Sequence, residues 1–278
     1  MSCPDCFSGH VHSGEPQGQV TKLHGLDVYV ASPAGDSTAI KGIVIIIPDA
    51  FGWEFVNNRI LADHYAQKSK YKVYLPEFMN GNACPTSAIT TMRDLYKNDT
   101  LSDWLWKPYY LSCAVSSMVP FMYSNRFSKA WPVVKSFFAA VRQNEGSGLP
   151  IGAAGFCWGG KYVVNLVHGA EVDGKPLIDA GFTGHPSFLK IPEEIEKIRI
   201  PVSFAMGELD MVVKKPQVEQ IQRIVDSKGV GEVRVYSGAG HGFCVRADHV
   251  LDNAEKQAAE AEDQALEWFN RHFANVSY

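Results

Sequence analysis

The spacing of apolar residues along the chain changes from one segment to the next, and each change predicts a different element. Residues 41–48 form a continuous β-branched run, which is typical of a strand buried on both faces of a parallel sheet. Residues 57–66 repeat with the period of a helix, and residues 71–76 form another short apolar strand. This alternation predicts an α/β domain with a mostly parallel central sheet flanked by helices.

The second half of the chain continues the same alternation. It predicts strands at residues 177–183, 201–206 and 233–236, and helices at residues 128–142, 217–228 and 254–273. Closer to the N-terminus, residues 21–31 alternate between apolar and polar positions, as a strand of an antiparallel pair does. The length of 278 residues suits this fold, so residues 1–278 are expected to form one domain.

Residues 77–125 interrupt this rhythm. The segment contains Asn-Gly-Asn and Cys-Pro sequences and then many aromatic residues, including Trp104 and Trp106. A long irregular insertion within a compact domain is usually functional. We therefore expect a lid or cap whose aromatic rings face the functional site; packing onto the core is the alternative role for such rings.

Composition excludes several classes of protein. The chain is 46% apolar and 20% charged, as ordinary globular proteins are. Its net charge of -4 gives no reason to expect nucleic acid or an anionic membrane as a partner. It has neither a membrane-length apolar run nor a signal-peptide pattern at its start, so we expect a cytoplasmic protein with reduced cysteines. Both a monomer and a homodimer remain open.

A cysteine between glycines is the strongest chemical signal in the chain. An apolar strand leads into Gly-Phe-Cys-Trp-Gly, with the cysteine at position 157, and residues 161–167 can be helical. Strand, sharp turn and helix form the context of a nucleophile elbow. The glycines permit a strained backbone, and the helix N-terminus favours a thiolate at Cys157. A buried structural cysteine in a tight turn is the alternative interpretation.

Two further residues suggest partners for Cys157. Asp210 follows the strand predicted at residues 201–206, and His241 lies between glycines after the strand at residues 233–236. The carboxyl ends of parallel strands meet at one edge of the sheet, so these three side chains should lie together. Nucleophile, acid and histidine follow one another in the order found in α/β-hydrolases, which predicts a catalytic triad.

The N-terminal segment contains residue types that bind zinc, namely Cys3, Cys6, His10 and His12. Structural zinc sites usually pair two separated half-sites across a loop, and this group is cramped. We therefore expect no metal here, and a role in a loop or at the edge of a lid instead.

Four motifs together resemble the dienelactone hydrolase (carboxymethylenebutenolidase-like) family. They are Pro-Asp-Ala-Phe-Gly at residues 48–52, the cysteine elbow, Gly-Glu-Leu-Asp at residues 207–210 and His-Gly-Phe at residues 241–243. The N-terminal cysteine-rich segment resembles leaders of the fungal branch of this family. The resemblance implies an α/β-hydrolase fold with a lid insertion, and hydrolysis of an ester, lactone or thioester without a cofactor.

The resemblance also implies roles for site residues. His241 would take the thiol proton, Cys157 would attack the carbonyl, and Asp210 would orient the imidazolium. The backbone amides of Trp158 and Ala50 would bind the oxyanion. Water would then cleave the thioester acyl-enzyme.

Substrate binding is expected to involve a compact, largely apolar or aromatic acyl compound. The family carries a glutamate that holds the resting thiol, and Asp49 occupies the matching position. Arg246 follows the histidine, one residue displaced from a family arginine that grips a substrate carboxylate, and Arg93 and Lys107 are candidates for a second cation. The candidates for substrate binding or thiol orientation are Asp49, Phe51, Arg246, His185, Trp104 and Trp106.

Two other functions compete with this prediction. A catalytically idle relative of the α/β-hydrolases would bind a small molecule, but it would have no use for an intact triad. A redox-sensing thiol protein would need a resolving cysteine near Cys157 in sequence, and the candidates Cys113 and Cys244 are both distant from it.

Overall fold

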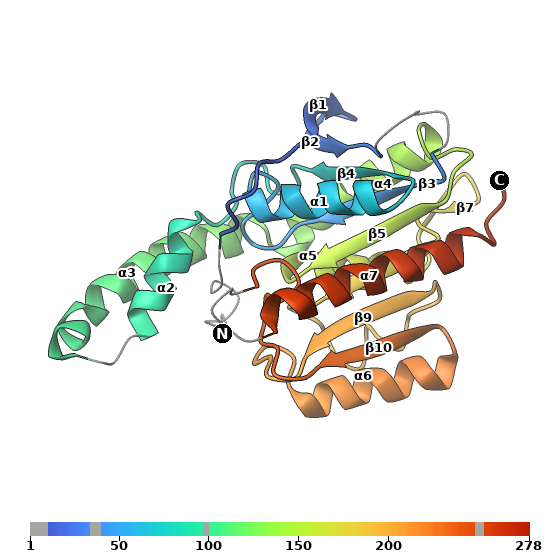
Figure 1. Cartoon of the computed structure of the whole chain (residues 1–278). Helices are drawn as coiled ribbons and strands as arrows, with labels where there is room; N and C mark the ends of the chain where they lie inside the picture. Colours follow the sequence, from blue (N-terminus) through green and yellow to red (C-terminus); the bar gives the residue numbers. More distant parts are fainter. Residues whose placement is uncertain (1–10, 34–39, 97–99, 248–252) are drawn as a thin grey trace.

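An eight-stranded sheet runs through the computed structural model, which describes residues 11–33, 40–96, 100–247 and 253–278 (Figure 1). The strand order is β1-β2-β4-β3-β5-β8-β9-β10. The bounds are β1 Gln19–Leu23, β2 Leu26–Ala31, β3 Gly42–Ile47, β4 Tyr71–Pro76, β5 Ile151–Phe156, β8 Ala180–Gly184, β9 Val202–Gly207 and β10 Gly231–Tyr236. A small hairpin of β6 (Glu171–Val172) and β7 (Lys175–Pro176) lies outside this sheet.

The sheet is mostly parallel, as the continuous apolar runs predict. Every neighbouring pair from β4 to β10 is parallel, whereas β2 runs antiparallel to both of its neighbours, β1 and β4. The prediction of one strand over residues 21–31 is wrong, because His24 and Gly25 turn the chain through positive φ angles of 49° and 84° and divide it into the hairpin β1–β2.

Helices cover both faces of this sheet. Their bounds are α1 Val56–Lys68, α4 Phe127–Gln143, α5 Trp158–Leu166, α6 Lys215–Lys228 and α7 Ala254–Phe273. In Figure 1, α1 and α7 lie in front of the sheet and α4 and α5 lie behind it. All six residues of β3 are buried between these layers, which explains their unbroken apolar pattern.

The segment at residues 77–125 is helical and not irregular as expected. It contains α2 (Ser87–Tyr96) and α3 (Leu101–Ser124), which pack against each other. Figure 1 shows this pair projecting from the body as an arm, with the start of α3 at the tip. Thr100 caps α3: its side chain accepts a 3.2 Å hydrogen bond from the Asp103 amide. This capping residue explains why the helix begins directly after it.

No helix in the described part of the chain is both long and apolar enough to cross a membrane.

Close backbone contacts hold α5 onto the strands. A Cβ atom on Gly159 would lie 2.0 Å from the Ile47 carbonyl oxygen of β3. A Cβ atom on Gly155 would meet the Gly159 carbonyl oxygen at 2.5 Å. Only glycine therefore fits at both positions, and the two glycines set how closely α5 approaches the sheet.

We predict that Gly159→Ala destabilises the chain by at least about 3 kcal/mol, because the clash is with backbone that cannot move aside. Gly148→Ala is the matched control: a methyl group added at Gly148 would have no other atom within 4 Å. Urea unfolding followed by circular dichroism measures both variants. Equal midpoints for the two variants would contradict the prediction.

Candidate active site

Cys157 occupies a strained turn between β5 and α5. Its φ and ψ angles are 50° and -110°, a conformation that non-glycine residues rarely adopt. The Cys157 amide donates to the Gly184 carbonyl at 3.2 Å, and its carbonyl accepts from the Ser187 amide at 2.9 Å. The loop after β8 therefore clamps the turn, and the thiol is held at the N-terminus of α5.

His241 and Asp210 lie beside this turn, as their positions after β10 and β9 predict. The His241 Nδ1 atom lies 2.8 Å from an Asp210 carboxylate oxygen. The other Asp210 oxygen accepts from the amides of Val212 at 2.7 Å and Val213 at 3.4 Å. This carboxylate therefore has fixed partners on both oxygens, and it fixes the orientation of the imidazole.

The charge on Cys157 shifts the titration of His241. Burial by itself lowers the pKa of His241, but the nearby Cys157 charge and hydrogen bonds with Asp210 and Cys157 overcome it and raise the pKa to about 10. A Cys157 thiolate and a His241 imidazolium therefore stabilise each other. Such a pair provides a nucleophile without further deprotonation.

Ser187 is a site residue that the sequence did not indicate. Its hydroxyl oxygen lies 3.4 Å from Cys157 Sγ and 3.3 Å from His241 Nε2, and the residue is fully buried. It follows the Gly-His-Pro turn after β8, and nothing in its local sequence marks it as reactive. The hydroxyl bridges the two reacting groups and can shift its hydrogen between them.

The two residues whose amides are expected to bind an oxyanion, Ala50 and Trp158, follow shortly after the ends of β3 and β5. Trp158 is the first residue of α5, where backbone N–H groups are left free of helical acceptors. Ala50 lies in the loop after β3 and is buried. The Trp158 indole donates to the Asn125 carbonyl at 3.1 Å and lies against Tyr162, so this side chain is anchored away from the reacting atoms.

Asp49 and Arg246 form an ion pair with both side chains fully buried. Asp49 also accepts from the Asn58 side chain at 3.0 Å and from the Phe51 amide at 3.2 Å. Burial raises the pKa of Asp49, Arg246 opposes this shift, and Cys157 adds to it. The guanidinium of Arg246 is enclosed and bound to Asp49, and the expectation that Arg246 grips a substrate carboxylate stays a prediction.

Phe51 and His185 pack behind the site. Phe51 is 3% exposed, and the Arg246 guanidinium lies 5.3 Å from its ring centre. His185 is fully buried with its ring 4.9 Å from that of His241. Burial first, and then the positive charges of His241 and Arg246, lower the pKa of His185, which keeps it neutral. Both side chains are enclosed in this structure, and their expected roles toward a substrate stay predictions.

The residues expected from the insertion do not line the site. Trp104 and Trp106 are 62% and 55% exposed on the outer part of the arm (Figure 1). Lys107 lies 4.3 Å over the Trp104 ring, and Arg93 lies on α2 beside Asp94. The expectation failed because the aromatic content of a segment expected to be irregular does not specify which way its side chains face.

An apolar pocket of about 250 Å³ lies next to the elbow. Trp158 follows Cys157 in the chain and Phe188 follows Ser187, and both line this pocket. The base of the arm closes it, through residues that include Phe121 and Met122. Cys157, Asp210 and His241 are not among the residues that line it, so the pocket adjoins the elbow without containing the triad residues.

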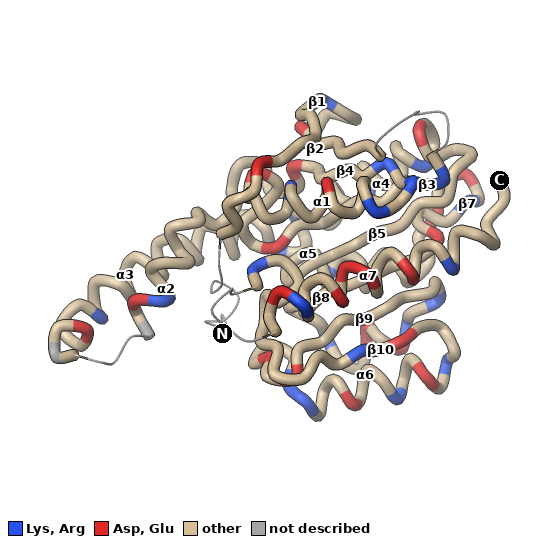
Figure 2. The backbone as a smooth tube through the Cα atoms, in the orientation of Figure 1, with Lys and Arg blue, Asp and Glu red and all other residues tan. Residues whose placement is uncertain are grey.

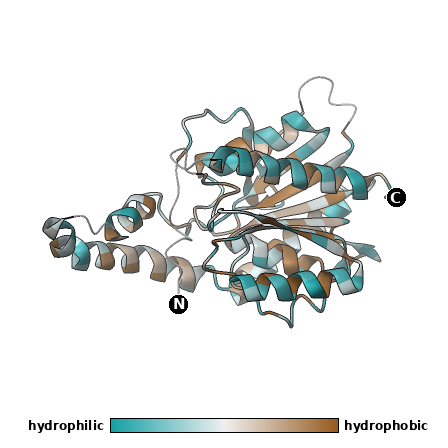
Figure 3. Cartoon of the chain, turned by 60° about the horizontal axis from the view of Figure 1, so that its bottom comes forward, coloured by the Kyte–Doolittle hydropathy of each residue, from teal (hydrophilic) through white to brown (hydrophobic). Residues whose placement is uncertain are grey.

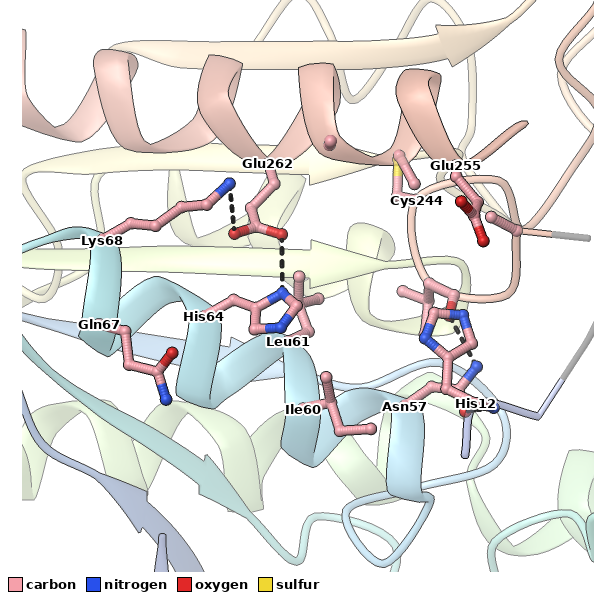
Figure 4. A pocket seen from close by; sticks show the side chains of 14 residues that line it. His12, Asn57, Ile60, Leu61, His64, Gln67, Lys68, Cys244, Glu255 and Glu262 are labelled. Atoms are coloured by element: carbon pink, nitrogen blue, oxygen red, sulfur yellow. Dashed lines mark hydrogen bonds and ion pairs between the residues drawn. The ribbon is translucent and has the colours of Figure 1, made fainter. Parts of the chain in front are cut away.

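A second pocket, of about 480 Å³, lies between α1 and α7 (Figure 4). His64 and Lys68 on α1 meet Glu262 on α7 at its edge, with 3.3 Å and 3.1 Å contacts. The His12 amide donates to Asn57, whose side chain donates to the Val245 carbonyl, each at 2.9 Å. These contacts support the loop that carries Arg246, and no triad residue lines this pocket.

Most of the residues considered for zinc binding lie outside the described ranges, so that prediction is mainly about residues the structure does not describe. Cys3, Cys6 and His10 lie there, whereas His12 is described. Within the described ranges, no group of three or more histidine, cysteine or acidic residues is arranged to hold a metal ion. The cysteines described in the structure, Cys84, Cys113, Cys157 and Cys244, are all free thiols.

Comparison with known proteins identifies the family. The model of the dienelactone hydrolase family matches residues 26–273. A hydrolase from Aspergillus violaceofuscus, pyvD, is 27% identical over 96% of this chain and 95% of its own length. Dienlactone hydrolase 1 from Gibberella moniliformis is 26% identical over 95% and 92%. A crystal structure from Klebsiella pneumoniae, provisionally described as a dienelactone hydrolase, has a TM-score of 0.62 at 17% identity, covering 97% of each chain.

The mostly parallel sheet, with its elbow after β5, has the α/β-hydrolase fold. The chain belongs to the dienelactone hydrolase family. The family places it among hydrolases of esters and lactones.

We predict that Arg246→Met destabilises the chain by about 3–5 kcal/mol, because it leaves the Asp49 carboxylate buried without its cation. The double variant Arg246→Met, Asp49→Asn removes both charges and should recover more than half of that loss. Urea unfolding at pH 7 gives the free energies. A loss below about 1 kcal/mol in the single variant, typical of surface ion pairs, would contradict the prediction.

Proposed function

We propose that the chain is a cysteine-dependent hydrolase of esters, lactones or thioesters, with Cys157 as nucleophile and His241 and Asp210 as its partners. The observation that carries the proposal is the strained Cys157 turn beside a histidine whose Nδ1 atom lies 2.8 Å from a buried carboxylate. The strain supports it independently, since backbone strain clusters at functional sites.

In the acylation step, the Cys157 thiolate attacks the carbonyl carbon of the substrate. The carbonyl oxygen becomes an oxyanion, and the amides of Trp158 and Ala50 would donate to it. The His241 imidazolium gives its proton to the departing alkoxide oxygen as the intermediate collapses. The products of this step are an alcohol and a Cys157 thioester; in a lactone the alcohol remains tethered to the acyl group.

In the deacylation step, neutral His241 takes a proton from water while the water oxygen attacks the thioester carbon. Asp210 stabilises the imidazolium that forms. Collapse of the second intermediate releases the carboxylic acid and regenerates the thiolate–imidazolium pair. Thiolate is a better leaving group than an amine, so the site suits esters, lactones and thioesters and not amides.

The enclosed Arg246 and the apolar pocket beside Trp158 indicate the substrate class. A buried guanidinium already paired with Asp49 cannot bind a substrate carboxylate without breaking that pair. The pocket walls are mostly apolar and include the rings of Phe121, Trp158 and Phe188. A compact apolar or aromatic acyl group fits such walls better than a small dianion does.

We predict that Cys157→Ala reduces turnover of a chromogenic aromatic acyl ester at least a thousandfold, because no nucleophile remains. Cys113→Ala, which replaces a half-buried thiol on the arm, should keep wild-type kcat/KM. Steady-state assays of the wild type and both variants give the result. Undiminished turnover in Cys157→Ala would contradict the proposal. Wild-type protein that binds the ester without hydrolysing it would instead favour the alternative, a catalytically idle relative that binds a small molecule.

We also predict an alkaline limit to the thiolate–imidazolium pair. The pKa of His241 is raised to about 10, so the pair persists through neutral pH and is lost as pH rises through about 10. Alkylation of Cys157 by iodoacetamide should therefore change less than about threefold between pH 7 and 9, whereas an ordinary thiol, with a pKa near 8.5, accelerates more than tenfold.

The pH dependence has an internal control. In Cys157→Ala the pKa of His241 should fall, because the thiolate that raises it is gone. Imidazole proton shifts in NMR spectra at increasing pH measure this. An unchanged His241 titration, or ordinary thiol behaviour in the alkylation rates, would contradict the ion-pair assignment.

A further inference from the structure

The arm exposes a line of apolar side chains along α3, here called the α3 stripe: Trp104, Leu111, Val115, Val119 and Met122. Their exposed fractions are 62%, 54%, 51%, 59% and 39%. Steps of seven, four, four and three residues place them on one face of a helix. Figure 3 shows the apolar colouring continuing along α3, in contrast to the hydrophilic outer faces of the helices on the body.

The α3 stripe is a different face from the buried face of α3. Ala114 and Phe121, which are 4% and 2% exposed, lie roughly a quarter turn around the helix from the stripe. The sequence of α3 contains only two charged residues, Asp103 and Lys107, both in its first two turns (Figure 2). Soluble monomers rarely expose so continuous an apolar surface.

The size of this surface matches what a stable dimer buries. Leu105 and Tyr123, which are 73% and 65% exposed, flank the stripe. Together these seven side chains present on the order of 600–800 Å² of exposed surface, against about 800 Å² per partner in a standard interface. A second protein chain can cover such an area completely, whereas a small ligand cannot.

The apolar positions of the α3 stripe are nearly symmetric about position 113. Trp104 and Met122 are each nine residues from position 113, and Leu111 and Val115 are each two residues from it. Two α3 helices lying antiparallel about a two-fold axis at this position would place an apolar residue opposite each of these four. Such self-complementarity is the requirement for an isologous dimer.

The charges favour the antiparallel direction. In that register the two charged residues of α3 lie apart from their counterparts, because position 103 faces Tyr123 and position 107 faces Val119 of the other copy. In a parallel pair, each Asp103 would instead meet Asp103 and each Lys107 would meet Lys107. Separation of like charges therefore favours the antiparallel orientation.

We propose that two copies of this chain form a dimer by pairing their α3 stripes antiparallel about a two-fold axis near residue 113. The proposal does not depend on the proposed hydrolase function, because it rests only on the arm.

The test is the mass of the full-length protein in solution. Sedimentation velocity over 1–100 µM should show a dimer for the wild type. Val115→Glu, near the two-fold axis, should raise the dissociation constant at least about a hundredfold, because it buries an unpaired carboxylate in the interface. Val235→Glu is the matched control: Val235 is 47% exposed on β10, and this variant should dimerise as the wild type does.

Disulfide crosslinking tests the register in a Cys113→Ser background. An oxidised mixture of Leu111→Cys chains and Val115→Cys chains should form mainly mixed disulfides, which peptide mapping identifies. A parallel pair would instead crosslink each variant with itself.

Several outcomes would overturn the proposal. They are a wild-type monomer at 100 µM, a dimer that Val115→Glu leaves intact, and self-crosslinking of each cysteine variant. A monomer that sediments with phosphatidylcholine vesicles through the stripe would assign the surface to a lipid interface instead. Because Cys157→Ala should dimerise as the wild type does, failure of the dimer and failure of the hydrolase function are distinguishable.

Discussion

The site depends on one strained backbone turn, the positive φ of Cys157. A side chain in this conformation costs energy, and the surrounding structure must overcome that cost. Two sets of contacts hold the backbone of the turn in place. Gly159 lies against the backbone of β3, and the loop after β8 forms hydrogen bonds with both backbone groups of Cys157. The same turn brings the sulfur of Cys157 within hydrogen-bonding reach of His241 and places Trp158 at the start of α5, so the proposed nucleophile and the proposed oxyanion donor depend on one constraint.

Burial makes the charges around this turn act strongly on one another. The thiol of Cys157 is almost inaccessible, and its charge raises the pKa values of both His241 and Asp49. Arg246 opposes the shift at Asp49, with which it forms a buried ion pair. This ion pair behind the site therefore offsets the charge of a carboxylate that burial would otherwise leave uncompensated.

The arm connects this site with the surface proposed for dimerisation. Its base, at Phe121 and Met122, closes the pocket beside Trp158, while its outer part carries the exposed apolar residues. Met122 belongs to both regions. In the proposed dimer, the outer part of one arm covers the base of the other, so assembly and the shape of the pocket are physically linked through the same helix.

Local sequence determined most of the fold and pointed to the candidate site residues. Unbroken apolar runs mark strands covered on both faces, and the glycines around Cys157 mark a turn that no larger residue permits. The tertiary structure decided what these patterns leave open. Arg246 is 197 residues from its partner Asp49, and Ser187 reaches Cys157 only through the pairing of β5 with β8. The direction of the arm was likewise hidden, because periodicity shows which face of a helix is apolar but not what covers it.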